Sequence, residues 1–247
     1  MEQIFAQTES AALEHRYDFC AGCGHGITIR LVAEVLDELQ LRERTVGVLG
    51  VGCYSTSPVT FDFDCQYALH GRAPAMATAV KRLLPDRLVF TFQGDGDMAA
   101  IGTTEVIHAA TRGENFTSLL LNNANFGETG GHLAPTTVLG QRTPSSPQGR
   151  TAEEHGYPTR LTEMLALLEG ARYVARVAVN KPTNVIRAKA AIKKAFRTQM
   201  AGQGFSMVEV LSACPSGWRL SPLEAHEWMD EVQTKTYPLG VLKETTQ

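Results

Sequence analysis

Residues 88–97 read LVFTFQGDGD, an apolar run that ends in two glycines alternating with two acids. The run predicts a buried strand, and the Gly-Asp-Gly turn at 94–96 predicts its carboxyl end. A second apolar run at 116–121 closes in Asn-Asn at 122–123. Because a helical pattern separates the two runs, we expect neighbouring parallel strands whose carboxyl ends lie at one edge of a sheet.

The same alternation of strand and helix patterns extends along the chain. It predicts an α/β fold, a parallel sheet with helices on both faces, formed as one domain over residues 1–247. Residues 1–18 are an N-terminal extension in this prediction. The expected helices cover 26–40, 72–84, 97–112, 161–169, 183–201 and the residues from about 222, and the further strands cover 45–51, 172–179 and 205–211.

Residues 124–160 break this alternation. They hold six glycines and four prolines, and they are far longer than an ordinary connection between elements. A stretch of this length and composition is typical of a functional loop or of a surface that binds a partner protein.

The composition is that of an ordinary globular protein, with 43% hydrophobic and 20% charged residues in a chain of 247. Its 23 basic and 26 acidic residues give a net charge of -3, which lacks the basic excess of a dedicated nucleic-acid-binding protein. No uncharged apolar run is long enough to span a bilayer, and no secretory signal is visible. We therefore expect a soluble, cytoplasmic protein that binds neither nucleic acid nor membrane.

The Gly-Asp-Gly turn has a chemical implication, because Asp95 by itself repels a phosphate. Glycines at a strand end let backbone amides approach an anionic ligand, and an acid among them implies a bridging cation such as Mg²⁺. Asn123, at the end of the neighbouring strand, can supply an amide oxygen to the same cation. The alternative is purely structural: a simple turn at 94–96 and a strand cap at 122–123.

Four of the five cysteines are positioned to share one site. Cys20 and Cys23 lie one turn apart beside a helix start, whereas Cys53 and Cys214 follow predicted strands. In a parallel sheet these strand ends converge on the edge that carries Asp95. Two thiolates do not complete a tetrahedral metal site or an iron–sulfur cluster, so all four would be needed. Spacing alone leaves three readings open: a structural zinc ion, an iron–sulfur cluster and buried free thiols.

The Gly-Asp-Gly turn followed by Asn-Asn resembles the cofactor motif of the thiamine-diphosphate-binding fold. This resemblance implies that Mg²⁺ is held by the carboxylate of Asp95, the side chain of Asn123 and the carbonyl of Asn125. The ion would in turn hold the diphosphate of the cofactor. Thiamine diphosphate acts as an electron sink when a 2-oxoacid loses CO₂.

A longer set of motifs covers nearly the whole chain: FCAGCGHG, GVGCY, LHGRAPAMATAVK, FQGDGDMAAIG, NNANFGETGGH and LSACPSGW, in this order. Together they resemble the beta subunit of the 2-oxoacid:ferredoxin oxidoreductases. The resemblance implies a four-iron four-sulfur (4Fe-4S) cluster bound by Cys20, Cys23, Cys53 and Cys214. It also implies contacts to thiamine diphosphate, with His70 as the candidate catalytic residue, from Val51, Gly52, Cys53, Tyr54, His70, Gly96, Asp97, Gly127 and Glu128.

The implied activity is oxidative decarboxylation of a 2-oxoacid to an acyl-coenzyme A and CO₂, with single electrons passing through the cluster to ferredoxin. The sequence shows neither a glutamate that would activate thiamine nor a coenzyme A site. The resemblance implies that an alpha subunit supplies both, in a heterodimer or a dimer of heterodimers, with gamma and delta subunits as further candidates.

The substrate is suggested by the C-terminal segments CPSGW, SPLEAHEW and YPLG. They resemble the enzymes that act on 2-oxoglutarate or branched-chain 2-oxoacids, and we favour 2-oxoglutarate. Two other functions stay open: a non-oxidative thiamine-dependent decarboxylase or synthase subunit with a structural metal, and a cluster-bearing electron-transfer protein with a degenerate thiamine site.

Three smaller features carry their own hypotheses. Cys65 matches no ligand position, so we interpret it as a packed free thiol rather than a redox residue. His132 stands where the family often has glutamine, as a plain loop residue or as a specificity residue. A basic helix face, either simply solvated or a docking face for an acidic ferredoxin, consists of Lys189, Lys193, Lys194 and Arg197.

Overall fold

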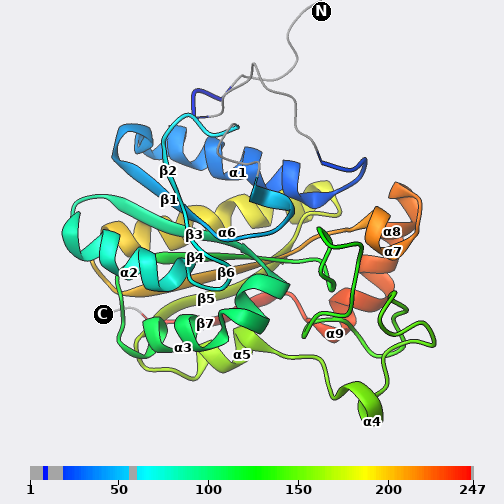
Figure 1. Ribbon diagram of the computed structural model, residues 1–247. Helices are drawn as coiled ribbons and strands as arrows, with labels where there is room; N and C mark the ends of the chain where they lie inside the picture. Colours follow the sequence, from blue (N-terminus) through cyan, green and yellow to red (C-terminus); the bar gives the residue numbers. More distant parts are fainter. Residues whose placement is uncertain (1–7, 11–18, 56–59, 246–247) are drawn as a thin grey trace, which may run out of the picture.

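A single mixed sheet organises the chain. The computed structural model describes residues 8–10, 19–55 and 60–245, so most of the expected N-terminal extension lies outside the described residues. The described strands form one seven-stranded sheet in the order β2-β1-β3-β4-β6-β5-β7 (Figure 1). Every neighbouring pair is parallel except β5 with β7. The strands are β1 (Thr45–Leu49), β2 (Asp64–Tyr67), β3 (Leu88–Gly94), β4 (Thr117–Asn122), β5 (Ala171–Ala178), β6 (Phe205–Leu211) and β7 (Gly240–Glu244).

Helices cover both faces of this sheet, as the alternating sequence pattern predicts (Figure 1). One face carries α1 (Gly24–Leu39) and α6 (Pro182–Met200). The other face carries α2 (Ala73–Leu83), α3 (Thr103–Thr111) and α5 (Leu161–Ala166). Short helices lie toward the C-terminal end and in the long connection, namely α4 (Ala152–His155), α7 (Pro215–Trp218), α8 (Pro222–Trp228) and α9 (Thr234–Thr236), with a 3-10 turn at Arg42–Arg44 and π-helices at Gly96–Ile101 and Met229–Gln233.

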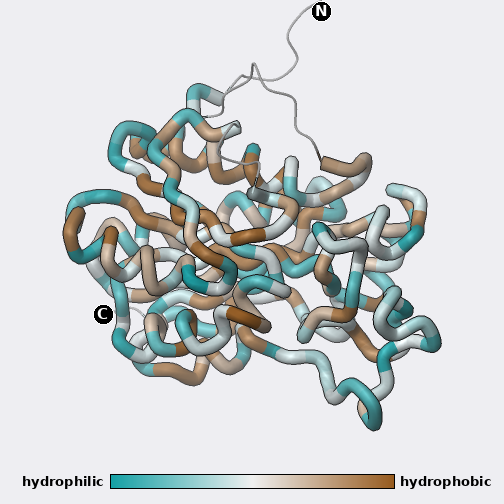
Figure 2. Tube along the Cα trace, viewed as in Figure 1, coloured by the Kyte–Doolittle hydropathy of each residue, from teal (hydrophilic) through white to brown (hydrophobic). Residues whose placement is uncertain are grey.

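The central strands are buried on both faces because helices pack on both. All residues of β4 and of β6 are buried. In β3, Phe90 and Phe92 face the layer of α1 and α6, whereas Val89 faces the opposite layer. Figure 2 shows the apolar residues gathered in the strands and the inner parts of the helices, with hydrophilic residues at outer tips such as α4.

Two expected elements need correction. The helix predicted over 97–112 is divided: a π-helix (Gly96–Ile101) is followed by Gly102, and α3 begins at Thr103. A Cβ at Gly102 would lie 2.6 Å from the carbonyl oxygen of Gly71, so this close approach of two segments requires glycine at the break. The strand predicted over 45–51 ends at Leu49.

The long 124–160 segment is irregular, as predicted, but it is tightly hydrogen-bonded. The guanidinium of Arg150 is buried and donates to six backbone carbonyls within the segment. Such a centre fixes the loop without regular structure, because it satisfies carbonyls that would otherwise be buried without partners. Within the described residues, no helix combines the length and apolar character needed to cross a bilayer.

Candidate functional site

Four neighbouring strands deliver the predicted site residues to one edge of the sheet. Strands β1, β3, β4 and β6 lie side by side in parallel, so their carboxyl ends share that edge. The segments that follow these strands carry Cys53, Asp95, Asn123 and Cys214 respectively. The parallel topology therefore brings together groups that are far apart in the sequence.

The carboxylate of Asp95 is buried in the turn after β3. Its Oδ1 accepts a hydrogen bond from the amide of Gly96 at 2.9 Å, and its Oδ2 accepts one from the hydroxyl of Thr136. Burial raises the pKa of Asp95 to about 7, although both hydrogen bonds oppose the rise. A bound cation would reverse this effect, because a positive charge favours the ionised carboxylate.

The end of the Asn123 side chain is surrounded by oxygens. The atom that faces them lies 3.2 Å from Asp95 Oδ1, 2.7 Å from the carbonyl oxygen of Asn125 and 3.1 Å from Asn125 Oδ1. Without a cation, the Asn123 amide nitrogen can occupy this position and donate to all three. With a cation, the Asn123 oxygen can occupy it and join the others as a ligand. An all-oxygen set of one carboxylate, amides and a carbonyl suits Mg²⁺, so these residues fit the predicted ion.

Asp97 plays a structural part in this edge. Its carboxylate accepts hydrogen bonds from the Tyr54 hydroxyl and from the amides of Val51 (3.2 Å) and Gly71. The Nδ1 atom of His70 lies 3.1 Å from Asp97 Oδ1. Asp97 therefore connects the turn after β1 to the turn before α2 and orients Tyr54, whereas His70 Nδ1 lies close to it without a hydrogen bond.

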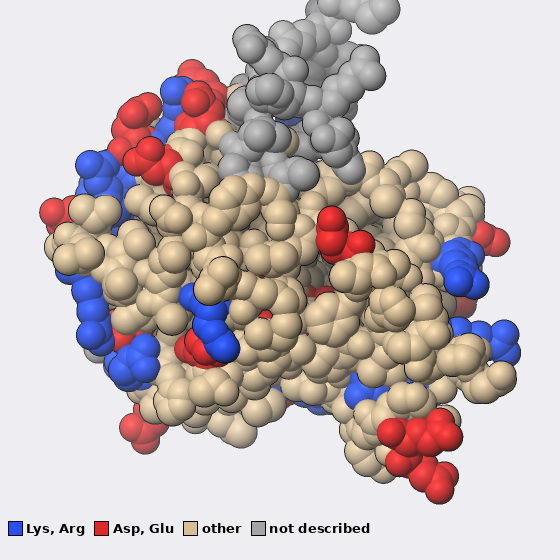
Figure 3. All heavy atoms as spheres, viewed as in Figure 1, with Lys and Arg blue, Asp and Glu red and all other residues tan. Residues whose placement is uncertain are grey.

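The residues at the carboxyl ends of the strands line a pocket of about 220 Å³, here called the carboxyl-edge pocket. Every residue predicted to contact thiamine diphosphate or Mg²⁺ lines it. Four other lining residues, His25, Gly94, Phe126 and Thr129, were not among the residues predicted to contact the cofactor or the ion. Figure 3 shows a hollow in the middle of this face, with acidic side chains at its rim and a largely uncharged surface around it.

The four predicted cluster ligands line a second cavity of about 290 Å³, here called the cysteine cavity. All four are free thiols, and burial raises the pKa values of Cys23 (to about 12), Cys53 and Cys214. Neighbouring thiols contribute to the raised pKa of Cys23, through Cys214 and Cys20, and to that of Cys53, through Cys214 and Cys23. Among the described residues, no three His, Cys, Asp or Glu side chains are arranged to hold a single metal ion.

The carboxyl-edge pocket and the cysteine cavity adjoin each other. Both are lined by His25, Cys53, Asn123, Gly127 and Glu128. The buried ring of His25 stacks between Phe19 and Tyr54, and its Nδ1 lies 3.2 Å from Cys23 Sγ. Burial lowers the pKa of His25 to about 4, so its imidazole is neutral near pH 7.

Several side chains that shape this edge were not predicted. Trp218 donates its indole N–H to the Asn123 carbonyl at 2.9 Å and packs against Trp228 with the two rings tilted by 52°. Thr136 reaches Asp95 from the 124–160 segment. A threonine in a loop carries no sequence signal of such a role, because the contact depends on how two distant segments meet.

The smaller predictions have different outcomes. Cys65 lies within β2, where burial raises its thiol pKa to about 12, and it lines neither the pocket nor the cysteine cavity. His132 is exposed, and its backbone pairs with that of Phe126. On the basic face of α6, Lys189 and Lys193 form ion pairs with acidic residues of α1, and Lys194 pairs with Glu244. This internal pairing favours a solvated face over a docking face.

Comparisons with known proteins agree with this geometry. The C-terminal TPP-binding domain of thiamine pyrophosphate enzymes matches residues 50–210. The 2-oxoglutarate synthase subunit KorB of Archaeoglobus fulgidus is 37% identical over 213 residues, which cover 86% of this chain and 75% of that subunit. The chain belongs to the beta-subunit family of the 2-oxoacid:ferredoxin oxidoreductases.

Other relatives of this oxidoreductase beta subunit differ in the substrate that they are named for. The ketoisovalerate oxidoreductase subunit VorA of Methanothermobacter thermautotrophicus is 41% identical over 221 residues, covering 90% of this chain and 46% of that subunit. The chain thus spans about half the length of that relative. A solved 2-oxoglutarate:ferredoxin oxidoreductase from Magnetococcus marinus, with 2-oxoglutarate, coenzyme A and succinyl-CoA bound, superposes with a TM-score of 0.78 at 27% identity, covering 96% of this chain and 84% of that chain.

Proposed function

We propose that this chain is the catalytic beta subunit of an enzyme that oxidatively decarboxylates a 2-oxoacid to an acyl-coenzyme A and CO₂. Electrons would leave one at a time through a 4Fe-4S cluster to ferredoxin. The observation that carries the proposal is the shared wall between the carboxyl-edge pocket and the cysteine cavity. A cofactor oxidised in the first would lie directly beside an electron acceptor in the second.

Thiamine diphosphate, when bound, supplies the electron sink for loss of CO₂. The oxygens of Asp95, Asn123 and Asn125 would hold the Mg²⁺ of its diphosphate. His70, held beside Asp97 and lining the pocket, is the side chain best placed to move a proton at the reacting centre. It is 32% exposed at the side chain, so solvent can exchange that proton.

The cysteine cavity supports a cluster rather than a single zinc ion. In a tetrahedral zinc site, each of the four thiolate sulfurs lies about 2.3 Å from the zinc ion. A cavity of about 290 Å³ between Cys20, Cys23, Cys53 and Cys214 leaves room for an inorganic core among the thiols. Because burial raises the pKa values of Cys23, Cys53 and Cys214, loading the cluster would release protons from these three thiols.

An alpha subunit would complete the active site. Val51, which lines the pocket, is 44% exposed, and further exposed apolar side chains lie at the end of β2, before α2 and at the end of the π-helix, namely Tyr67 (49%), Leu69 (80%) and Ile101 (45%). Exposed apolar side chains of this kind are typical of a surface that a partner covers. We propose that the partner contributes the coenzyme A site and the glutamate that activates thiamine, in a heterodimer or a dimer of heterodimers.

Two substrates are proposed, each on its own observation. The C-terminal segments favour 2-oxoglutarate. The carboxyl-edge pocket favours 2-oxoisovalerate, because no lysine or arginine of the described residues lines it to pair with a second carboxylate. The ketoisovalerate subunits among the relatives are consistent with the second choice.

The test is dye reduction by the chain purified anaerobically together with its alpha subunit. We expect methyl viologen to be reduced when a 2-oxoacid, coenzyme A, Mg²⁺ and thiamine diphosphate are all present, and not when any one is omitted. The ratio of kcat/KM for 2-oxoisovalerate and 2-oxoglutarate then assigns the substrate. Release of CO₂ without dye reduction would instead indicate a non-oxidative decarboxylase.

A further inference from the structure

Thr136 lies at the metal-facing carboxylate without facing the metal position itself. Its hydroxyl donates to Asp95 Oδ2, whereas Asp95 Oδ1 is the oxygen that lies 3.2 Å from the end of Asn123. We propose that Thr136 is a positioning residue, which fixes the Asp95 carboxylate with Oδ1 turned toward Asn123 and so sets the affinity of the site for Mg²⁺. The inference rests on the proposed Mg²⁺ and thiamine diphosphate site.

The turn that carries Thr136 is closed on itself. The amide of Thr137 donates to the Ala134 carbonyl at 3.1 Å, and the Ala134 amide donates to Thr137 Oγ1 at 2.8 Å. Thr137 Oγ1 in turn donates to the carbonyl of Ala124, at 2.8 Å, just after the Asn-Asn pair. The turn is thereby attached to the same strand end that positions Asn123.

Arg150, which lies later in the same 124–160 segment, holds this turn in place by hydrogen bonds. Its Nη1 donates to the carbonyls of Ala134 (3.1 Å), Pro135 (2.9 Å) and Thr137 (2.7 Å), which flank Thr136 on both sides. Arg150 is 4% exposed, so water does not compete for these carbonyls. A charged donor shared among three carbonyls holds the backbone more firmly than neutral hydrogen bonds would.

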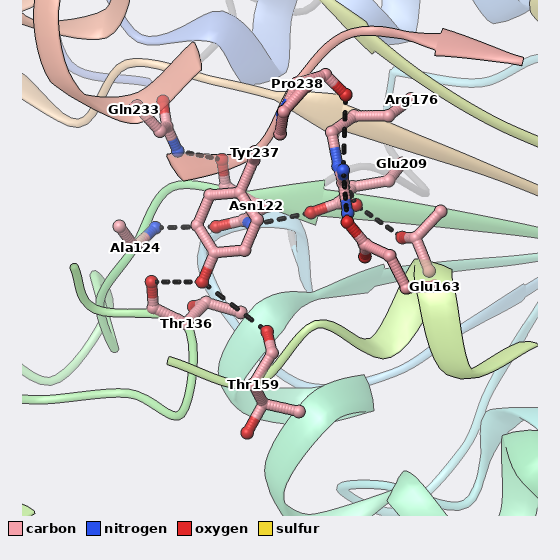
Figure 4. Close-up of polar contacts among 11 residues, drawn as sticks. Asn122, Ala124, Thr136, Thr159, Glu163, Arg176, Glu209, Gln233, Tyr237 and Pro238 are labelled. Carbon is pink, nitrogen blue, oxygen red and sulfur yellow. Dashed lines mark hydrogen bonds and ion pairs between the residues drawn. The ribbon is translucent and has the colours of Figure 1, made fainter. Parts of the chain in front are cut away.

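Tyr237 completes the support from the C-terminal segment. Its hydroxyl donates to the carbonyl of Thr136 at 2.8 Å, and its ring is fully buried with the guanidinium of Arg176 at 5.2 Å from its centroid. Figure 4 shows the Tyr237 hydroxyl pointing toward Thr136 and Thr159. With its carbonyl and both neighbouring carbonyls engaged, Thr136 has little freedom to direct its hydroxyl elsewhere.

This arrangement matters because a carboxylate binds a metal ion well only if one of its oxygens is oriented toward the ion. Thr136 holds Oδ2, and the Gly96 amide holds Oδ1 on the side where it faces the end of Asn123, so rotation that would turn Oδ1 away is opposed. Partners that orient a metal ligand in this way typically change metal affinity by about 10- to 100-fold when they are removed. Thr136→Val keeps the shape of the side chain and removes the hydroxyl, whereas Thr136→Ser keeps the hydroxyl.

The experiment is a calorimetric titration of the metal-stripped complex of this chain and its alpha subunit with Mg²⁺ at saturating thiamine diphosphate. We expect the Kd for Mg²⁺ to rise about 10- to 100-fold in Thr136→Val and to stay within about threefold of wild type in Thr136→Ser. Tyr237→Phe removes the support of Thr136 without touching the hydroxyl, and we expect a smaller rise. Thr111→Val, at an exposed threonine of α3, is the matched control and should bind as wild type does.

A wild-type Kd in Thr136→Val would overturn the inference. If that variant does not fold, Tyr237→Phe decides: a wild-type Kd there would equally overturn it. The proposed function fails in a distinguishable way, since the wild-type complex itself would then show no Mg²⁺-dependent binding of thiamine diphosphate.

Discussion

At the scale of single residues, the carboxyl edge depends on positions where no side-chain atom can be added. A Cβ at Gly96 would lie 2.2 Å from the ring of Phe126, and one at Gly50 would lie 1.7 Å from Asp97 Oδ2. Both glycines lie between rigid groups of the site. The Gly-Asp-Gly motif therefore serves close packing as well as access of a ligand to the backbone.

We expect Gly96→Ala to lower the free energy of unfolding by about 1–3 kcal/mol, because the Phe126 ring must move to accommodate the methyl group. The control is Gly26→Ala in α1, where the nearest atom would be an ordinary contact at 3.8 Å. There we expect stabilisation of up to about 1 kcal/mol, because alanine favours the helix. Urea unfolding of both variants measures the difference, and equal effects would contradict the steric explanation.

The buried carboxylate of Asp97 accepts three hydrogen bonds from other parts of this chain. Asp97→Asn keeps the shape of the side chain but replaces one carboxylate oxygen by an N–H₂ group. That group then faces the hydrogen-bond donors of Val51, Tyr54 or Gly71. We expect a loss of about 2–3 kcal/mol in unfolding free energy, since a buried donor is left facing another donor. Asp62→Asn, at an exposed ion pair with Arg42, should change stability by less than about 1 kcal/mol. A loss in Asp97→Asn no larger than this control would count against the role assigned to Asp97.

His25 makes stability depend on pH. Its pKa is lowered to about 4 in the folded chain from 6.5, so the stability it contributes is present above pH 6.5 and is lost as the pH falls toward 4. At about pH 5 the expected loss is about 2 kcal/mol, because the unfolded chain is protonated first. Urea unfolding of the metal-free chain at about pH 7.5 and about pH 5 measures this loss. A His25→Gln variant should lack this component, and an identical pH profile in the variant would refute the assignment.

At the scale of secondary-structure elements, the sequence predicts the centre of the sheet better than its edges. Strands β3, β4 and β6 are buried on both faces and therefore appear as continuous apolar runs. The edge strands β2 and β7 were missed, because DCQY and GVLKE are largely exposed and carry no apolar run. The antiparallel direction of β7 has no local signal either, since it depends on the path of the chain after α9.

The predicted site follows the same logic. Motif positions at strand ends could be inferred to meet because parallel topology imposes it. Thr136 and Arg150 come from an irregular segment and Trp218 from the short helix α7, and tertiary hydrogen bonds set where each of them lies. One missed feature does have a signal in the sequence. Glu209 is an acidic residue within the apolar run 205–211, which indicates that it has a buried partner of opposite charge.

That partner is Arg176 on the neighbouring strand β5. Its guanidinium is 1% exposed, and its Nε donates to Glu209 at 2.6 Å, while Glu163 accepts from its terminal nitrogens (Figure 4). Burial would lower the pKa of Arg176, but the two carboxylates raise it. Glu209 also accepts from Asn122 at 2.6 Å, so the network ties β5 and β6 to the end of β4 beside the site.

We expect Glu209→Gln to lower the free energy of unfolding by about 3–5 kcal/mol, because it leaves a buried guanidinium without full compensation. Lys194→Gln, which removes one partner of an exposed ion pair with Glu244, should cost less than about 1 kcal/mol. Thermal and urea unfolding of both variants provide the comparison. A similar small loss in both would mean that the buried network contributes little to stability.

At the scale of the whole molecule, one sheet edge combines two sites with different chemistry. Oxygen ligands at the ends of β3 and β4 suit a hard cation, whereas thiols at the N-terminal loop and after β1 and β6 suit iron. His25, packed between them, lines both hollows. Figure 3 shows a largely uncharged surface around the hollow on this face.

The most direct test is the content of iron and acid-labile sulfide per chain, measured after anaerobic purification with the alpha subunit. We predict about four irons and four sulfides in the wild type. Both should be lost when any one ligand is changed to serine, that is in Cys20→Ser, Cys23→Ser, Cys53→Ser and Cys214→Ser. The control Cys65→Ser should retain them, because Cys65 lies in β2 away from the cavity. Stoichiometric zinc in place of iron, or a cluster that survives all four changes, would contradict the assignment of this chain as an electron-transferring catalytic subunit.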